Sequence, residues 1–69
     1  EKSFATIAGL WSAYLGIPLA PHDVAAMQAL VKLARIRGSD GLHRDSWVDL
    51  AGYAACGAEC VIEAVTSAP

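Results

Sequence analysis

The chain has 69 residues, of which 55% are hydrophobic and 17% are charged, with five Lys and Arg against seven Asp and Glu. A net charge of −2 provides no positive field for a phosphate backbone, which argues against nucleic acid as a partner. A chain of this size buries only about 60% of its surface on folding, so the apolar excess predicts one domain that associates with copies of itself.

No targeting or membrane-spanning segment is recognisable. The uncharged stretch at residues 3–22 contains Gly9, Gly16, Pro18 and Pro21, so it does not resemble a span of about 20 apolar residues. A basic start followed by a small-residue cleavage site, typical of a signal peptide, is also missing. We therefore expect a cytoplasmic protein without membrane contact. The chain starts at a glutamate rather than at Met, which indicates either trimming of the N-terminus or a fragment of a longer chain with further residues upstream.

The first predicted helix spans residues 3–15. Its apolar residues recur at steps of three and four, which is the period of an amphipathic helix. Ser3 is a suitable N-cap, and Gly16 is a suitable residue to end the helix. A short connector with Pro18 follows, because residues before proline avoid the helical region. The predicted apolar stripe consists of Phe4, Ile7, Ala8, Trp11, Tyr14 and Leu15.

The second predicted helix spans residues 21–37. Pro21 suits the first turn, where an N–H donor is not needed, and Asp23 places negative charge near the positive end of the helix dipole. Arg35 and Arg37 place positive charge in the last turn, and the Gly-Ser-Asp-Gly run after them ends the helix. The predicted buried stripe consists of Val24, Met27, Leu30, Val31 and Ala34.

The third predicted helix spans residues 44–65 and is the longest of the three. Its middle consists mainly of small residues, and Gly52 and Gly57 each cost about 1 kcal/mol relative to alanine. Close approach of another helix would offset that cost. Cys56 and Cys60 lie one turn apart on this helix, which does not suit a disulfide, so reduced and buried thiols are expected. The sequence as a whole predicts an all-α, three-helix domain that is completed by oligomerisation.

One face of the third helix is acidic. Asp45 and Asp49 stand one turn apart, and an antiparallel second helix would bring Lys32 and Arg35 against them. In one interpretation these charges form ion pairs that hold the helices in register. In the other, the two carboxylates bind Mg²⁺ and the two cations contact substrate phosphates. The residues predicted to share this face are Asp45, Asp49, Gly52, Cys56, Glu59 and Glu63.

The remaining candidate residues suit packing and binding rather than catalysis. His22 and His43 each lie at the start of a predicted helix, where an exposed or capping role is expected, and no catalytic residue is assigned. Aromatic side chains anchor many protein interfaces, and small residues permit close helix contact. The candidate core or interface residues are Trp11, Tyr14, Trp47, Tyr53, Gly52 and Gly57.

Four segments carry a family resemblance. They are FATIAGLW at residues 4–11, PHDVA at 21–25, KLARI at 32–36 and HRDSWVDLAGYA at 43–54. Together they resemble a domain-of-unknown-function family found mainly in tailed phages and prophages, which implies a phage-type protein in the cytoplasm of a bacterial host. Ala20 departs from the capping threonine expected before PHDVA.

The KLARI segment and the DSWVDLAGYA segment are also similar, more distantly, to phage nucleotide-modification-associated domains and to all-α nucleotide pyrophosphohydrolases of the MazG and dimeric dUTPase type. This resemblance implies nucleotide chemistry with Mg²⁺ held by acidic residues on two helices. The second helix here has no acidic pair after Asp23. The sequence therefore favours an accessory protein that binds a nucleotide or a partner protein without turnover. The alternatives are a module that binds a host protein and a Mg²⁺-dependent nucleoside triphosphate pyrophosphohydrolase.

Overall fold

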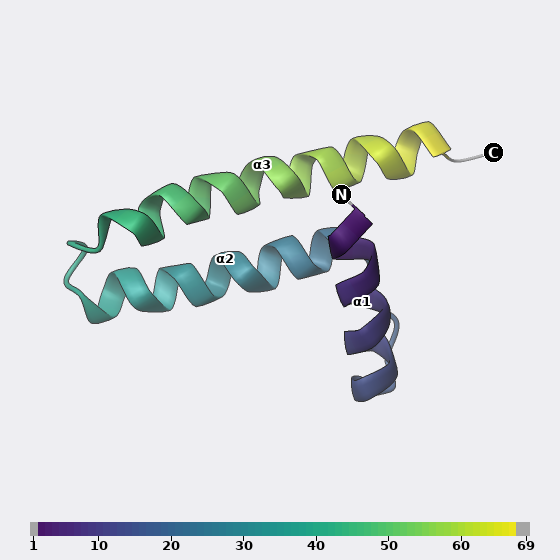
Figure 1. Ribbon diagram of the computed structural model, residues 1–69, viewed down its shortest axis with the longest axis horizontal. Helices are drawn as coiled ribbons and strands as arrows, with labels where there is room; N and C mark the ends of the chain where they lie inside the picture. Colours follow the sequence, from purple (N-terminus) through teal and green to yellow (C-terminus); the bar gives the residue numbers. More distant parts are fainter. Residues whose placement is uncertain (1, 68–69) are drawn as a thin grey trace.

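The computed structural model describes residues 2–67, and the side chains of residues 3–62 and of Ala64. It contains the helices α1 (Lys2–Leu15), α2 (Pro21–Gly38) and α3 (Arg44–Ser67), and no strand occurs within this range. Figure 1 shows α2 and α3 side by side as an antiparallel hairpin, with α1 running across one end of it. The all-α prediction is confirmed, and every helix end lies within two residues of its predicted position.

The connector between α1 and α2 is held against α1 by one serine. Ser12 Oγ donates a hydrogen bond to the carbonyl of Ala8 at 2.6 Å and accepts one from the N–H of Leu19 at 2.8 Å. Gly16 has a φ of +73°, a left-handed conformation that glycine adopts without a steric penalty. The chain therefore reverses immediately after α1, so that α2 starts close to it.

The start of α2 has half of a capping box. The carboxylate of Asp23 accepts the N–H of Ala20 at 2.8 Å, and Ala20 has the extended backbone of an N-cap residue, with φ −93° and ψ 162°. A full capping box also needs a side-chain oxygen at the N-cap position, which an alanine methyl group does not provide. This position therefore lacks a favourable interaction that threonine would supply.

We expect Ala20→Thr to raise the free energy of unfolding by about 1 kcal/mol, because the hydroxyl can accept a backbone N–H in the first turn of α2. Urea denaturation followed by circular dichroism measures this change. Ala20→Val is the matched control, since it has the same branched shape and no oxygen. An equal gain from valine would show that the effect does not come from capping.

The turn between α2 and α3 is a Schellman motif. The N–H of Gly41 donates to the carbonyl of Ile36 at 2.8 Å, and the N–H of Asp40 donates to the carbonyl of Arg37 at 3.2 Å. Asp40 and Gly41 both have positive φ, at 54° and 81°. The indole Nε1 of Trp47 then donates to the carbonyl of Gly41 at 3.0 Å, which ties the turn to the first part of α3.

His43 caps the start of α3, which is the capping role expected for it. Its Nδ1 lies 2.6 Å from Ser46 Oγ and accepts the backbone N–H of Ser46 at 3.3 Å. Ser46 is fully buried, so its hydroxyl needs a partner inside the protein. The imidazole of His43 supplies that partner and is thereby committed to structure. His22 is exposed in the first turn of α2, where its Nε2 lies 3.6 Å from Asp23 Oδ1.

The core lies where α1 crosses the hairpin. The rings of Phe4 from α1 and Tyr53 from α3 are stacked, with centroids 6.2 Å apart and planes at 24°. Fully and partly buried apolar residues from all three helices surround this pair, so the core depends on α1 as much as on the hairpin. The buried members are Phe4, Ala8, Val24, Ala25 and Cys60, and those packed against them are Ile7, Trp11, Tyr53 and Cys56.

The predicted buried stripe of α2 is wrong except for Val24. Met27, Leu30 and Val31 are exposed, as is Ala34. The side of α2 that faces α3 instead contains Ala25, Lys32 and Ile36, which follow one another at steps of seven and four residues and therefore share one side of the helix. Apolar residues surround most of α2, so periodicity does not distinguish one face. The small Ala25 and the Lys32 ion pair determine which face meets α3.

The molecule is flat and its core is small. Its radius of gyration is 13.4 Å, whereas a compact chain of this length has a value of about 11 Å. Its accessible surface is 4971 Å², whereas about 4,100 Å² is typical for a monomer of this mass. Much apolar surface is therefore left uncovered by the chain itself. None of the helices in the described range is long and apolar enough to cross a membrane.

Candidate functional site

The α2–α3 hairpin brings Lys32 and Asp49 together. Lys32 Nζ lies 3.0 Å from Asp49 Oδ2, and the exposed fractions of the two side chains are 12% and 48%. A lysine side chain that is covered to this extent needs an acceptor for its ammonium group, because burial removes hydration. Asp49 provides that acceptor. The pair therefore has a structural reason to exist that does not involve a ligand.

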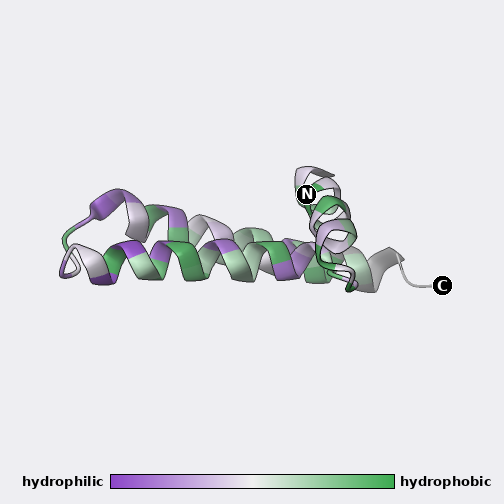
Figure 2. Cartoon of the chain, turned by 90° about the horizontal axis from the view of Figure 1, so that it is seen from below, coloured by the Kyte–Doolittle hydropathy of each residue, from purple (hydrophilic) through white to green (hydrophobic). Residues whose placement is uncertain are grey.

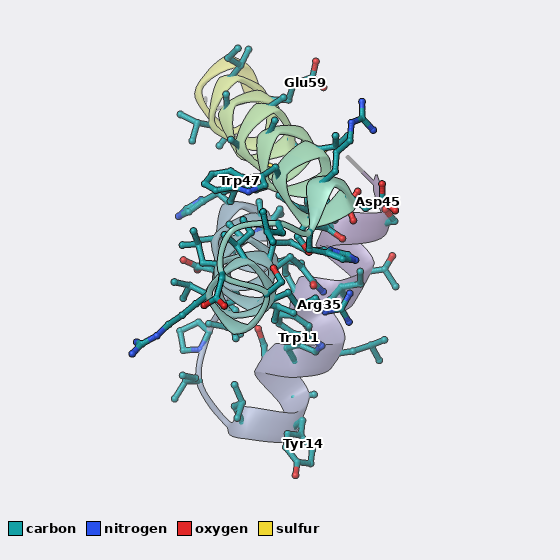
Figure 3. The ribbon with its side chains drawn as sticks, turned by 90° about the vertical axis from the view of Figure 1, so that its left-hand side faces the viewer. Trp11, Tyr14, Arg35, Asp45, Trp47 and Glu59 are labelled. Atoms are coloured by element: carbon teal, nitrogen blue, oxygen red, sulfur yellow. The ribbon has the colours of Figure 1, made fainter. Side chains whose placement is uncertain are left out.

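The other two predicted charges are arranged differently. Figure 3 shows Arg35 and Asp45 on the same side of the hairpin as α1. Both residues are exposed, and no ion pair joins them among the residues that the structure describes. Asp45 lies in the first turn of α3, where a carboxylate stabilises the positive end of the helix dipole. The four predicted charges thus form one close pair and two separate exposed groups.

The acidic face does not gather into a metal centre. Within the described part of the chain, no three His, Cys, Asp or Glu side chains lie close enough together to hold a metal ion. Asp45 and Asp49 are the predicted ligands, but a metal on Asp49 would compete with the Lys32 ammonium. Glu59 is exposed further along α3, and the side chain of Glu63 lies outside the described residues. Binding of Mg²⁺ therefore stays a prediction.

Two surface hollows border these charges. One hollow has a volume of about 390 Å³ and is lined by Arg35, Gly38, Ser39 and His43. These described residues provide a guanidinium and an imidazole, but no carboxylate that would activate a water molecule. The other, of about 340 Å³, contains the carboxylate that already contacts Lys32; it is lined by Val48, Asp49, Gly52, Tyr53 and Cys56. Hydrolysis of a nucleoside triphosphate would require a free carboxylate beside a cation, and the described residues that line these two hollows do not provide that combination.

The two glycines of α3 have different surroundings. A Cβ atom placed on Gly57 would lie 3.4 Å from the Cβ of Ala25, so the predicted close approach of another helix occurs here, and that helix is α2 of the same chain. A Cβ atom on Gly52 would meet nothing within 4 Å. Gly57 thus serves the hairpin, whereas a side chain at Gly52 would contact no other part of the chain that the structure describes.

We expect Gly52→Ala to stabilise the domain by about 1 kcal/mol, because alanine is the better helix former and the site is open. Thermal unfolding followed by circular dichroism measures this gain. Gly57→Leu is the contrasting variant, since its side chain would enter the contact with Ala25 and separate the helices. Loss of stability in Gly52→Ala would indicate that a second molecule covers Gly52.

The predicted aromatic residues also divide into two groups. Trp11 and Tyr53 are half-buried and pack against the core. Trp47 is half exposed and donates to the turn, and Tyr14 is 90% exposed. Tyr14 therefore contributes almost nothing to the packing of the chain that carries it.

Tyr14 belongs to an apolar surface at the end of α1, which we term the outer α1 patch. We define the patch by the exposed side chains of Leu10 and Tyr14, one turn apart on α1, together with those of Leu15 and Ile17 at the end of the helix. Leu10 and Ile17 were not among the predicted site residues. Their signal is a second apolar row, Leu10, Tyr14 and Ile17, at steps of four and three beside the predicted stripe.

Comparison with known proteins places the chain among phage relatives. It is similar to the Gene 55 protein of Mycobacterium phage D29, with 46% identity over 56 residues, which cover 81% of this chain and 36% of that protein. It is also similar to the Gene 55 protein of Mycobacterium phage L5, with 51% identity over 55 residues, which cover 78% of this chain and 35% of that protein. The chain spans about a third of the length of these curated relatives.

No solved structure matches the chain. The model of one protein family matches residues 1–61, which is most of the chain. The predicted resemblance to a phage domain of unknown function is confirmed by this match and by the two phage relatives. The likeness to MazG-type pyrophosphohydrolases stays a prediction. The chain belongs to the family described as a domain of unknown function, DUF6378.

Proposed function

We propose that this domain is a non-catalytic interaction module that binds a partner protein through the outer α1 patch. The observation that supports this most is the exposure of Tyr14, at 90%, among three large aliphatic side chains. In Figure 3, Tyr14 lies at the far end of α1 and points away from the hairpin. Tyrosine in such a position has an apolar ring for contact and a hydroxyl for one hydrogen bond.

The chemistry of the patch indicates the kind of partner. No charged residue occurs between residues 3 and 21, so neither the patch nor its flanks carry charge. A partner surface that matches it is apolar with a hydrogen-bond acceptor for the Tyr14 hydroxyl. Nucleotides are a poor match for this surface because their phosphates require cations.

The charged residues support the same proposal. Asp49 stabilises Lys32, His43 caps α3, and the hollow beside Arg35 lacks a carboxylate. Each predicted metal-binding or phosphate-binding group is therefore either engaged in the fold or isolated. A module without turnover needs none of these groups for chemistry.

The proposal is tested with a photo-crosslinking amino acid placed at position 14 in host cells that produce the protein. We expect one discrete adduct, which disappears when Leu10→Ser is added. The matched control places the same amino acid at Ala5, which is exposed on another side of α1. Equal adducts at both positions, or no adduct at position 14, would contradict the proposal.

A second experiment addresses the rival function. Mg²⁺ and a panel of nucleoside triphosphates are titrated into the protein by calorimetry, with an Asp45→Asn, Asp49→Asn variant beside it. We expect no heat of binding from either protein. Binding that the double variant abolishes would support the pyrophosphohydrolase alternative instead.

A further inference from the structure

The hairpin has a second uncovered surface, on the side away from α1. Figure 2 shows α1 rising from one side of the hairpin and nothing covering the other. Figure 3 shows Trp47 on the opposite side of α3 from Asp45. We term this surface the bare hairpin face. It is represented by Leu30, Leu33, Trp47, Ala54, Ala58 and Val61, which are all exposed.

The face is suited to a protein interface in its charge. At 100° per residue, Trp47, Ala54 and Ala58 share one side of α3, while the acidic residues share another. Two copies that meet through this face would therefore keep their carboxylates apart. On α2, the exposed Arg37 lies one turn from Leu33, at the turn end of the face. Its long side chain can keep the guanidinium in water at the rim while the apolar residues are buried, which limits the electrostatic cost of burial.

The area of the face matches what a dimer needs. With 18 residues in α2 and a 1.5 Å rise, the face is about 27 Å long, and two adjacent helices give it a width of about 20 Å. That corresponds to about 540 Å² on each copy, and a pair exceeds the ~1,000 Å² expected of a specific interface. The surface of the chain beyond that of a compact monomer, roughly 850 Å², is sufficient to supply this area.

The shape of the face indicates which molecule covers it. Its bulky side chains Leu30, Leu33 and Trp47 lie in the half nearer the turn. The small side chains of Ala54 and Ala58 lie in the other half, and Val61 follows them at the far end. A two-fold axis through the middle of the face places the bulky end of one copy on the small end of the other. Both halves are then filled at once, which is the property of a self-complementary surface.

We propose that two copies of this chain pair through the bare hairpin face about a two-fold axis and form a four-helix bundle from their hairpins. Trp47 of each copy packs on Ala58 of the other. Both α1 helices lie outside the bundle, so the dimer presents two outer α1 patches. The dimer does not depend on the partner-binding function proposed for those patches, so an experiment that contradicts one of the two proposals leaves the other standing.

Sedimentation equilibrium of the chain tests the pairing. We expect a mass twice that of the 7.2 kDa monomer. Ala58→Glu should weaken the dimer about a hundredfold, because it buries an unpaired carboxylate in the interface, without loss of helicity. The matched control is Leu10→Glu, which introduces the same charge in the outer α1 patch and should leave the dimer intact.

The predicted register gives a second, sharper test. Trp47→Lys should also dissociate the dimer, and combining it with Ala58→Glu should restore association, since the two new charges then face each other across the two-fold axis. A monomeric parent chain would overturn the proposal. A dimer that survives Ala58→Glu or Trp47→Lys, or that only Leu10→Glu dissociates, would overturn it as well. If Ala58→Glu does not fold, Trp47→Lys alone decides.

Discussion

Replacing Phe4 with alanine is expected to destabilise the domain by about 3 kcal/mol, the lower end of the range for a buried aromatic residue. Phe4 is buried and stacks on Tyr53, and it connects α1 to the end of the hairpin. A core in a chain this small supplies only about 3–5 kcal/mol. Phe4→Ala should therefore detach α1 from the hairpin. Hydrogen exchange of α1 amides, compared with those of α2 and α3, measures this release.

The matched control for this prediction is Leu10→Ala, on the same helix. Leu10 is exposed, so its truncation removes little buried surface and should change the free energy of unfolding by less than about 0.5 kcal/mol. If the two variants destabilise the domain equally, the position of α1 described here is wrong.

Asp49→Asn is expected to destabilise the domain by about 2 kcal/mol, because it leaves the ammonium of Lys32 without a carboxylate in a site that excludes most water. The half-exposed position of Asp49 keeps this cost below that of a fully buried pair. Urea denaturation at neutral pH measures the change. The loss should occur without any ligand present, because the pair is part of the fold.

The double variant Lys32→Met, Asp49→Leu separates pairing from packing. Replacing both partners by apolar residues of similar size leaves no unpaired charge, so it should recover most of the stability that Asp49→Asn loses. A double variant that is no more stable than Asp49→Asn would show that the ion pair makes a net contribution of its own. An Asp49→Asn protein of unchanged stability would instead leave Asp49 free for another role.

The ends of the helices are predictable from the sequence because local chemistry determines them. Gly16 ends α1 through a left-handed conformation, Pro21 suits the first turn of α2, and the turn around Gly41 closes α2 with a Schellman motif. These effects act between residues that are close in the sequence. Capping and turn preferences therefore identify them without reference to the rest of the fold.

The choice of buried face on α2 is not predictable in the same way. Leu30 and Val31 are as apolar as Val24, yet they remain exposed. Which face of α2 is buried depends on the close fit of Ala25 to Gly57 and on the attraction between Lys32 and Asp49. Both are contacts between separate helices. A helix with apolar residues on most sides leaves this choice to tertiary packing.

The candidate site, like the fold, was predictable only in part. The spacing of charges on antiparallel helices suggested that Lys32 and Asp49 meet, and they do. The same reasoning placed Asp45 and Arg35 in one network with that pair, but side chains near the ends of the helices have room to extend into solvent. Exposure itself, as of Tyr14, is a property of the assembled fold that sequence periodicity does not contain.

The turn that joins α2 to α3 has a consequence for the order in which the chain folds. Its hydrogen bonds join neighbours in the sequence, whereas Phe4 and Tyr53 come from distant segments. Because closing a longer loop costs more entropy, the hairpin should form first and α1 should dock afterwards. Trp47 lies at the turn and Trp11 lies on α1. Two variants that each keep one of these indoles therefore report the two steps separately by fluorescence.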